Sequence, residues 1–143
     1  MKNYGTVWYC MKSKAIIFDL DGTLVCNPSW DGDLERFYKN IFEGFTVEWC
    51  QTLIECLQVR IIFITARSER CRRQTEQQLN MWFDKPYELY MRGKNDLRID
   101  HEVKEDYLKE IMEKYQVLCC FDDNPENCKM FSKYIPTLQV VRQ

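Results

Sequence analysis

The sequence has a single histidine, no glycine-rich phosphate-binding loop and no long apolar run. His101 is the only histidine, which makes a histidine-based general base or a zinc site hard to build. Neither GxGxxG nor GxxxxGK followed by Ser or Thr occurs, so nucleotide binding through those loops is not supported. No apolar run approaches the length of a membrane-spanning helix, and we expect no membrane partner.

Disulfide and zinc signatures are also missing, although the chain has eight cysteines. No CxxC pair and no Cys/His pair at zinc-ligand spacing occurs. Cys119 and Cys120 fall inside an expected apolar strand, so we interpret the cysteines as reduced thiols packed as small hydrophobic side chains. Residues 1–12 show no apolar core followed by a cleavage site, so we expect no signal peptide and a cytoplasmic location.

Length and net charge limit what the chain can be. At 143 residues it has the size of one ordinary domain, and we expect a single domain over residues 1–143. A net charge of −2 argues against a surface coated in positive charge for non-specific nucleic-acid binding, but it leaves room for a local basic patch. Residues 1–12 are expected to form an extension or an added edge strand. The sequence indicates no oligomeric state.

The strongest chemical signal is an apolar segment that runs into two carboxylates. Residues 15–18 predict a strand buried on both faces, and Asp19 and Asp21 follow where this strand ends. Side chains two residues apart on an extended backbone point the same way, so both carboxylates can face a crevice beyond the strand. Two close carboxylates repel each other, and a bound cation usually keeps both charged. A site with oxygen ligands alone suits Mg²⁺. The alternative is a solvated turn, because Asp-Gly is ordinary turn chemistry.

The same pattern of apolar strand and polar tip recurs along the chain. Further strands are expected over residues 59–65, 86–91, 117–121 and 137–141, and the polar tips include Thr65 and the pair Asp122 and Asp123. Helices are expected over residues 33–42, 47–57, 66–82 and 103–115, and another begins at Pro125. This alternation predicts an α/β fold: a doubly wound, Rossmann-like parallel sheet of about five strands with helices on both faces. Residues 26–58 then form a helical segment near the polar tips, without a large cap domain.

Three further expectations concern the predicted helices. A helix that begins at Ala66 would place free backbone N–H groups and the positive end of its dipole beside Thr65, which favours a bound phosphate. The alternative for Thr65 is a hydroxyl bonded to its own loop. Lys104 lies in the first turn of the helix expected to begin at Val103, where a cation is unfavourable unless an anion is held nearby. Trp49, in the second helix, is interpreted as a core residue.

Four motifs resemble, in order, those of the haloacid dehalogenase (HAD) superfamily of phosphotransferases: residues 19–23 (Asp-Leu-Asp-Gly-Thr), Thr65, Lys104, and the pair Asp122 and Asp123. The resemblance covers most of the chain. It implies that Asp19 attacks phosphorus and becomes an aspartyl-phosphate, and that Asp21 protonates the leaving oxygen and then activates water. It also implies that Thr65 and Lys104 hold the transferring phosphoryl group. Mg²⁺ would bind Asp19, the Asp21 carbonyl, and Asp122 or Asp123.

A narrower resemblance rests on residues that the superfamily does not require. Residues 65–67 (Thr-Ala-Arg), residues 91–92 (Met-Arg) and the pattern D-x-R-x-D-x-x-V-K over residues 96–104 are similar to the 3′-phosphatase domains of bacteriophage polynucleotide kinase/phosphatases. This implies Mg²⁺-dependent removal of 3′-phosphates from polynucleotide ends or nucleotides, with a separate kinase or ligase as partner. Asp100 would support Lys104 or Arg67, and the residues implied to bind substrate are Thr65, Ala66, Arg67, Arg92, Arg98 and Asp100.

Two other functions are compatible with parts of this pattern. A small-molecule phosphatase, such as a 5′-nucleotidase or a sugar phosphatase, would use the same four motifs. A non-catalytic binding module would be expected to lose Asp19, Asp21 or Lys104, and all three are present. The arginines between residues 67 and 98 favour a polyanion, but those on the predicted helix have a plainer interpretation as a solvated face balanced by Glu69 and Glu76.

Overall fold

The computed structural model describes residues 11–27 and 32–141. Its centre is a parallel sheet of five strands in the order β5-β4-β1-β6-β7, which confirms the predicted fold class. The strands are β1 (Lys14–Phe18), β4 (Arg60–Ser68), β5 (Tyr87–Arg92), β6 (Gln116–Asp122) and β7 (Thr137–Gln139). Because β1 lies in the middle, the residues that follow it lie at the centre of one sheet edge. Residues 1–10 of the expected extension or added edge strand lie outside the described residues.

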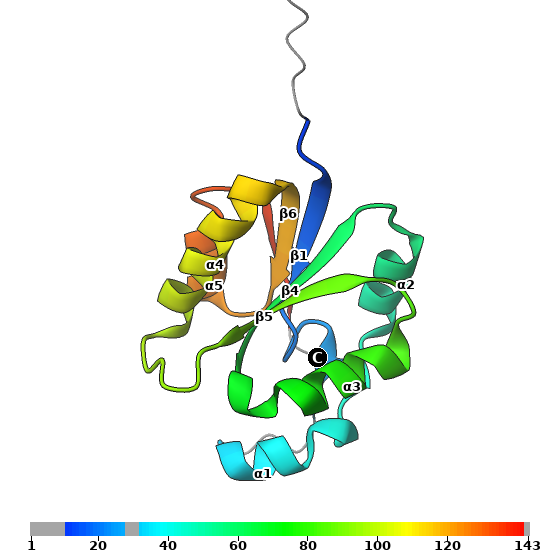
Figure 1. Cartoon of the computed structure of the whole chain (residues 1–143), viewed down its shortest axis with the longest axis vertical. Helices are drawn as coiled ribbons and strands as arrows, with labels where there is room; N and C mark the ends of the chain where they lie inside the picture. Colours follow the sequence, from blue (N-terminus) through cyan, green and yellow to red (C-terminus); the bar gives the residue numbers. More distant parts are fainter. Residues whose placement is uncertain (1–10, 28–31, 142–143) are drawn as a thin grey trace, which may run out of the picture.

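Helices cover both faces of this sheet (Figure 1). The helices α4 (Asp100–Lys114) and α5 (Pro125–Phe131) lie on one side, and α2 (Glu48–Cys56) and α3 (Arg72–Trp82) lie on the other. Successive strand residues point to opposite faces. Phe18 and Phe63 therefore pack with α2 and α3, whereas Ile17 and Ile62 pack with α4 and α5. Burial on both faces explains why these strands are continuously apolar.

The segment between β1 and β4 builds one end of the molecule. β2 (Val25–Cys26) pairs antiparallel with β3 (Phe45–Thr46), and α1 (Leu34–Lys39) and the 3-10 helix η1 (Ile41–Glu43) lie between them in the chain. In Figure 1, α1 lies beyond the end of the sheet where β1 finishes. A Cβ atom on Gly44 would lie 2.9 Å from Val25 Cγ1, so the turn before β3 requires glycine. Strands of two residues have no readable period, which is why the sequence predicts only helices here.

The prediction that a helix begins at Ala66 is wrong. β4 continues to Ser68, the 3-10 helix η2 (Glu69–Cys71) follows, and α3 begins at Arg72. After a register shift, Ser68 pairs with Arg92 of β5, and this pairing extends the strand. The residues after Thr65 are therefore strand rather than a helix start that could hold a phosphate. The Thr65 hydroxyl accepts a hydrogen bond from the Arg67 N–H at 3.1 Å, in agreement with the alternative interpretation of Thr65.

Other expectations also have outcomes in the described residues. Trp49 is 41% exposed, so its assignment to the core is wrong. α4 begins at Asp100, which moves Lys104 from the first to the second turn of its helix. All seven described cysteines are free, and four of them are buried, in agreement with packed reduced thiols: Cys50, Cys71, Cys120 and Cys128. None of the helices in this part of the chain has both the length and the apolar character needed to cross a bilayer.

Candidate active site

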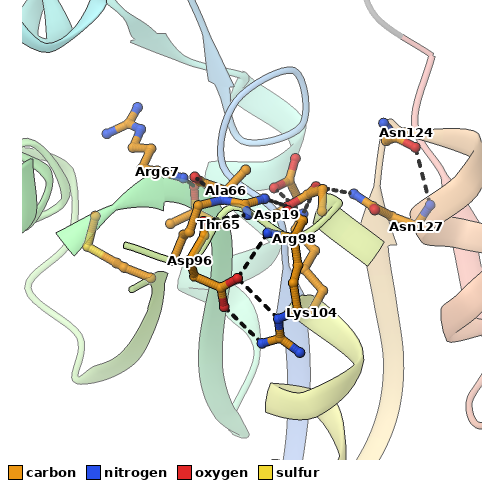
Figure 2. Close-up of polar contacts among 12 residues, drawn as sticks. Asp19, Thr65, Ala66, Arg67, Asp96, Arg98, Lys104, Asn124 and Asn127 are labelled. Carbon is orange, nitrogen blue, oxygen red and sulfur yellow. Dashed lines mark hydrogen bonds and ion pairs between the residues drawn. The ribbon is translucent and has the colours of Figure 1, made fainter. Parts of the chain in front are cut away.

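A cleft of about 840 Å³ opens at the carboxyl edge of the sheet. The ends of β1 and β4 and the beginnings of α4 and α5 contribute its polar floor, which Figure 2 shows in close-up. The four residues expected to be catalytic all line this cleft: Asp19, Asp21, Thr65 and Lys104. The carboxyl ends of parallel strands meet at one edge, so tips that are far apart in the sequence come together here.

Lys104 is the buried cation at the centre of the site. Its Nζ lies 2.8 Å from Asp19 Oδ1 and 2.8 Å from Asp122 Oδ2. The side chain is almost fully buried and reaches from α4 to the ends of the neighbouring strands β1 and β6, as Figure 2 shows for Asp19. A buried ammonium persists in a protein when carboxylates pair with it, and both partners are present.

The pKa values of this ion-pair cluster are shifted. Burial raises the pKa of Asp19 well above its usual range, and the charge of Asp122 adds to the rise while Lys104 opposes it. Burial alone would lower the pKa of Lys104, but Asp19, Asp122 and Asp100 together raise it well above its usual range. Lys104 is therefore cationic at neutral pH, whereas the negative charge on Asp19 gains from any additional cation nearby.

Three carboxylates form a group that fits such a cation. One oxygen each of Asp19, Asp122 and Asp123 lies within 4.8 Å of the other two. The Thr23 hydroxyl lies 3.4 Å from Asp19 Oδ2 and 3.5 Å from Asp123 Oδ1, which ties the turn after β1 to the same group. An all-oxygen donor set suits a hard cation such as Mg²⁺. The residues present therefore fit the metal that the sequence predicts, although the Asp21 carboxylate lies outside this group.

The Asp21 carboxylate is bound by Arg67. Both Asp21 oxygens accept hydrogen bonds from the guanidinium at 2.8 Å, and the Arg67 side chain is 1% exposed whereas that of Asp21 is 33% exposed. Burial opposes charge on Arg67, but Asp21 raises the pKa of the guanidinium. Arg67 was expected to contact a substrate phosphate. In this structure its fork is directed to Asp21, which remains open to the cleft.

Asn127 is a site residue that the sequence analysis does not identify. Its Nδ2 donates to Asp100 Oδ2 at 2.8 Å and to Asp122 Oδ2 at 3.2 Å, so it joins α5 to α4 and β6. Asp100 also lies 3.7 Å from Lys104 Nζ, one of the two contacts expected for it. Figure 2 shows Asn127 directed into the site while Asn124 begins the helix. A buried amide at the start of a helix has no motif of its own, and only its position after Asp122 and Asp123 could have indicated it.

Arg92 and Arg98 do not line the cleft. Arg92 Nη2 lies 3.2 Å from Asp100 Oδ1, and its Nη1 donates to the Arg98 carbonyl at 2.6 Å. Arg98 pairs with Asp96 at 2.8 Å, as Figure 2 shows, and with Asp106 at 2.7 Å. The loop expected to meet a polyanion therefore holds much of its positive charge in internal ion pairs, whereas Thr65, Ala66 and Arg67 do line the cleft.

Known proteins are similar to this chain over most of its length. Residues 13–143 match the family described as the polynucleotide kinase PNKP phosphatase domain. A protein of Autographa californica nuclear polyhedrosis virus, with the provisional name bifunctional polynucleotide kinase/RNA ligase, is 31% identical over 130 residues, which are 87% of this chain and 19% of that protein.

Two solved structures have the same fold. A chain from the Pnkp1/Rnl/Hen1 RNA repair complex superposes with a TM-score of 0.81 at 27% identity, over 92% of this chain and 43% of that chain. A second structure of the Pnkp1/Rnl/Hen1 complex gives a TM-score of 0.78 at 28% identity, over 92% of this chain and 46% of that chain. The chain thus spans less than half the length of each of these relatives.

Proposed function

This chain belongs to the family of polynucleotide kinase PNKP phosphatase domains, and on that premise we propose that it is a Mg²⁺-dependent phosphomonoesterase that removes 3′-phosphates from polynucleotide ends. One observation carries the proposal beyond the family assignment. Asp19, held by the buried Lys104, and Asp21, held by the buried Arg67, line one cleft beside a group of three carboxylates. This arrangement supports a nucleophile and a proton-transfer group in the same open site.

The proposed reaction has two steps. An Asp19 carboxylate oxygen attacks phosphorus, the bond between phosphorus and the 3′-oxygen breaks, and Asp21 gives its proton to that leaving oxygen. Asp21 then takes a proton from a water molecule, which attacks the phosphorus of the aspartyl-phosphate and releases inorganic phosphate. Asp21 suits the proton transfers because it is partly exposed to the cleft, whereas Asp19 is 6% exposed and fixed on Lys104.

Other side chains would support the charge of the phosphoryl group. Lys104 places an ammonium next to Asp19, and the Thr65 hydroxyl and the backbone at Ala66 line the cleft nearby. Arg67 is directed to Asp21, so we assign it a positioning role toward the acid. Asp100 and Asn127 position Lys104 and Asp122 through their contacts with these two residues. Arg92 would act through Asp100, with which it pairs.

Mg²⁺ would be held by Asp19, by the Asp21 carbonyl and by Asp122 or Asp123. When bound, the ion supplies positive charge that offsets the repulsion between the attacking carboxylate and the phosphate oxygens. The same charge would favour the ionised form of Asp19, whose pKa is raised in the cluster without a metal.

The relatives support a setting in nucleic-acid repair. The printed names of the viral relative and of the two solved structures include a polynucleotide kinase/RNA ligase and an RNA repair complex. We assign this chain the end-healing phosphatase step, performed in the cytoplasm. Its proposed partner is a kinase, or a ligase that joins the resulting 3′-hydroxyl.

A matched set of substrates tests the proposal. Phosphate release with and without Mg²⁺ is measured on a 3′-phosphorylated oligonucleotide, its 5′-phosphorylated counterpart, and 3′- and 5′-mononucleotides. Preference for the 3′-phosphorylated oligonucleotide is the expected result. Preference for the 5′-mononucleotide would make this chain a small-molecule phosphatase, and no turnover of any substrate with any divalent cation would contradict an enzymatic function.

A further inference from the structure

The cleft has an aromatic wall that the phosphoryl chemistry does not use. Phe45 of β3 and Trp49 of α2 both line it, and they are 55% and 41% exposed. Val47 lies between them in the chain and lines the same cleft. Large apolar side chains that line a polar cleft and remain exposed indicate a ligand with an apolar face.

Trp49 is anchored to residues that lie next to the site carboxylates. Its ring centroid is 5.6 Å from that of Phe121, and Phe121 stacks on Phe18 at 4.9 Å with an interplanar angle of 7°. Phe18 and Phe121 are partners across β1 and β6 and directly precede Asp19 and Asp122. The indole therefore packs against Phe121 at an interplanar angle of 54°, and its side chain still contributes surface to the cleft.

The backbone that carries this wall is fixed by contacts with the core. Phe45 pairs with Cys26 in the short antiparallel sheet, and the Val47 N–H donates to the Leu24 carbonyl at 2.8 Å. Gly44, which precedes Phe45, passes so close to Val25 that a Cβ atom would not fit. The wall is thus formed before any ligand binds, which lowers the entropy cost of using it.

The charges around the cleft argue against a basic track for a nucleic-acid backbone. Among the described residues that line it, Arg67 and Lys104 are the only basic ones, and both are buried and paired with aspartates. Glu48 adds a negative charge beside Trp49. Several phosphates of a strand would have few cations to meet here, so affinity for a polynucleotide end must come from another part of the end.

We infer that Trp49, with Phe45 lining the same cleft, stacks the base of the 3′-terminal nucleoside while the terminal phosphate lies at Asp19; this inference rests on the proposed function. Every base has a π face, so such a platform accepts any sequence. Recognition would then depend on the last nucleotide rather than on a long strand. The rate should consequently depend less on salt than it would for a protein that contacts many phosphates.

The test compares two 3′-phosphorylated oligonucleotides that differ only in the terminal residue, which carries a base in one and is abasic in the other. Removing a stacked base is expected to raise the KM of the wild type about 5- to 150-fold. In Trp49→Ala the base-bearing substrate should lose this advantage, whereas Trp49→Phe should retain most of it. Phe42→Ala is the matched control, because Phe42 is 48% exposed in the same segment but does not line the cleft.

The outcomes separate stacking from a structural role. Loss of packing on Phe121 alone would lower activity on both substrates equally in Trp49→Ala, and that result would overturn the platform. Equal use of the two substrates by the wild type would overturn it too, without affecting the phosphatase assignment. A wild type that hydrolyses no 3′-phosphorylated end would instead overturn the proposed function and the platform with it. DNA and RNA versions of both substrates show whether the sugar contributes.

Discussion

Arg67 and Asp21 are joined by two hydrogen bonds of 2.8 Å across 46 residues of sequence. The remaining terminal nitrogen of Arg67 donates to Gln78 at 2.9 Å and to Thr75 at 3.2 Å. The Phe37 ring of α1 lies 5.3 Å from the guanidinium carbon. Arg67 therefore connects the proposed general acid to α3 and α1. The orientation of the Asp21 carboxylate therefore depends on the buried guanidinium group of Arg67 as well as on its own loop.

Arg67→Lys should remove the paired hydrogen bonds that hold the Asp21 carboxylate while keeping a positive charge at this position. Lysine cannot supply the fork, so we expect turnover to fall by about 10² or more. Thr75 and Gln78 would each lose a buried donor, and the free energy of unfolding should fall by about 1–3 kcal/mol. Phosphate release and urea unfolding measure the two effects, with the exposed Arg73→Lys as control. Full activity in Arg67→Lys would remove Arg67 from the mechanism.

Lys104→Met should destabilise the protein as well as inactivate it. Without the ammonium, Asp19 and Asp122 would be buried carboxylates facing each other, and breaking such a buried pair costs about 3–5 kcal/mol. Added Mg²⁺ should restore part of the loss, because it supplies the missing positive charge. Lys109→Met is the control, since its 3.5 Å pair with Glu105 is exposed and should contribute under about 1 kcal/mol. Equal melting temperatures for the two variants would contradict this account.

The sheet could be predicted because its strands are apolar on both faces. Residues such as Ile17 and Phe63 belong to continuous apolar runs that have to be covered on two sides, and this alone indicates helices on both faces. The boundary after Thr65 could not be predicted, because pairing of Ser68 with Arg92 extends β4 through a sequence that also suits a helix start. Long-range pairing overrode the local signal there.

The position of polar residues in one cleft was predictable where they follow strands. Asp19 and Thr65 were expected there because they lie at strand tips, and Lys104 because of its place in the order of motifs, and the fold brings all three to one cleft. Their catalytic roles stay predictions. Asn127 and the exposure of Trp49 were not predicted. A buried amide and a tryptophan on an amphipathic helix look the same in sequence whether they serve the core or a ligand. Their roles follow from which neighbours the fold provides, and those neighbours are distant in the chain.

Mg²⁺ should stabilise the protein, and its affinity should rise with pH. Cation binding to Asp19 and to Asp122 or Asp123 adds about 2.7 kcal/mol to the free energy of unfolding at a Mg²⁺ concentration of 100 times the Kd. Because burial raises the pKa of Asp19, a fraction of the molecules carries a proton on this carboxyl group and has to lose it when the ion binds. Affinity is then weak below the raised pKa and increases as the pH passes through it. Titration calorimetry in buffers of different ionisation enthalpy would reveal the released proton, and Asp123→Asn should weaken binding. A Kd that is unchanged by pH and by this variant would place the ion elsewhere.

Asp19→Asn should abolish turnover and leave the fold intact. Asparagine has nearly the same volume and lacks the nucleophilic carboxylate, and Lys104 keeps its 2.8 Å contact with Asp122. We expect phosphate release to fall by at least about 10³ with little change in melting temperature. Acid-quenched wild type should show the added mass of a phosphoryl group by intact mass spectrometry, whereas the variant should show none. Asp106→Asn, which changes an exposed carboxylate outside the cleft, serves as control. Retained turnover in Asp19→Asn would show that phosphate is released without a covalent intermediate at this residue, because no other change to the site distinguishes the two proteins.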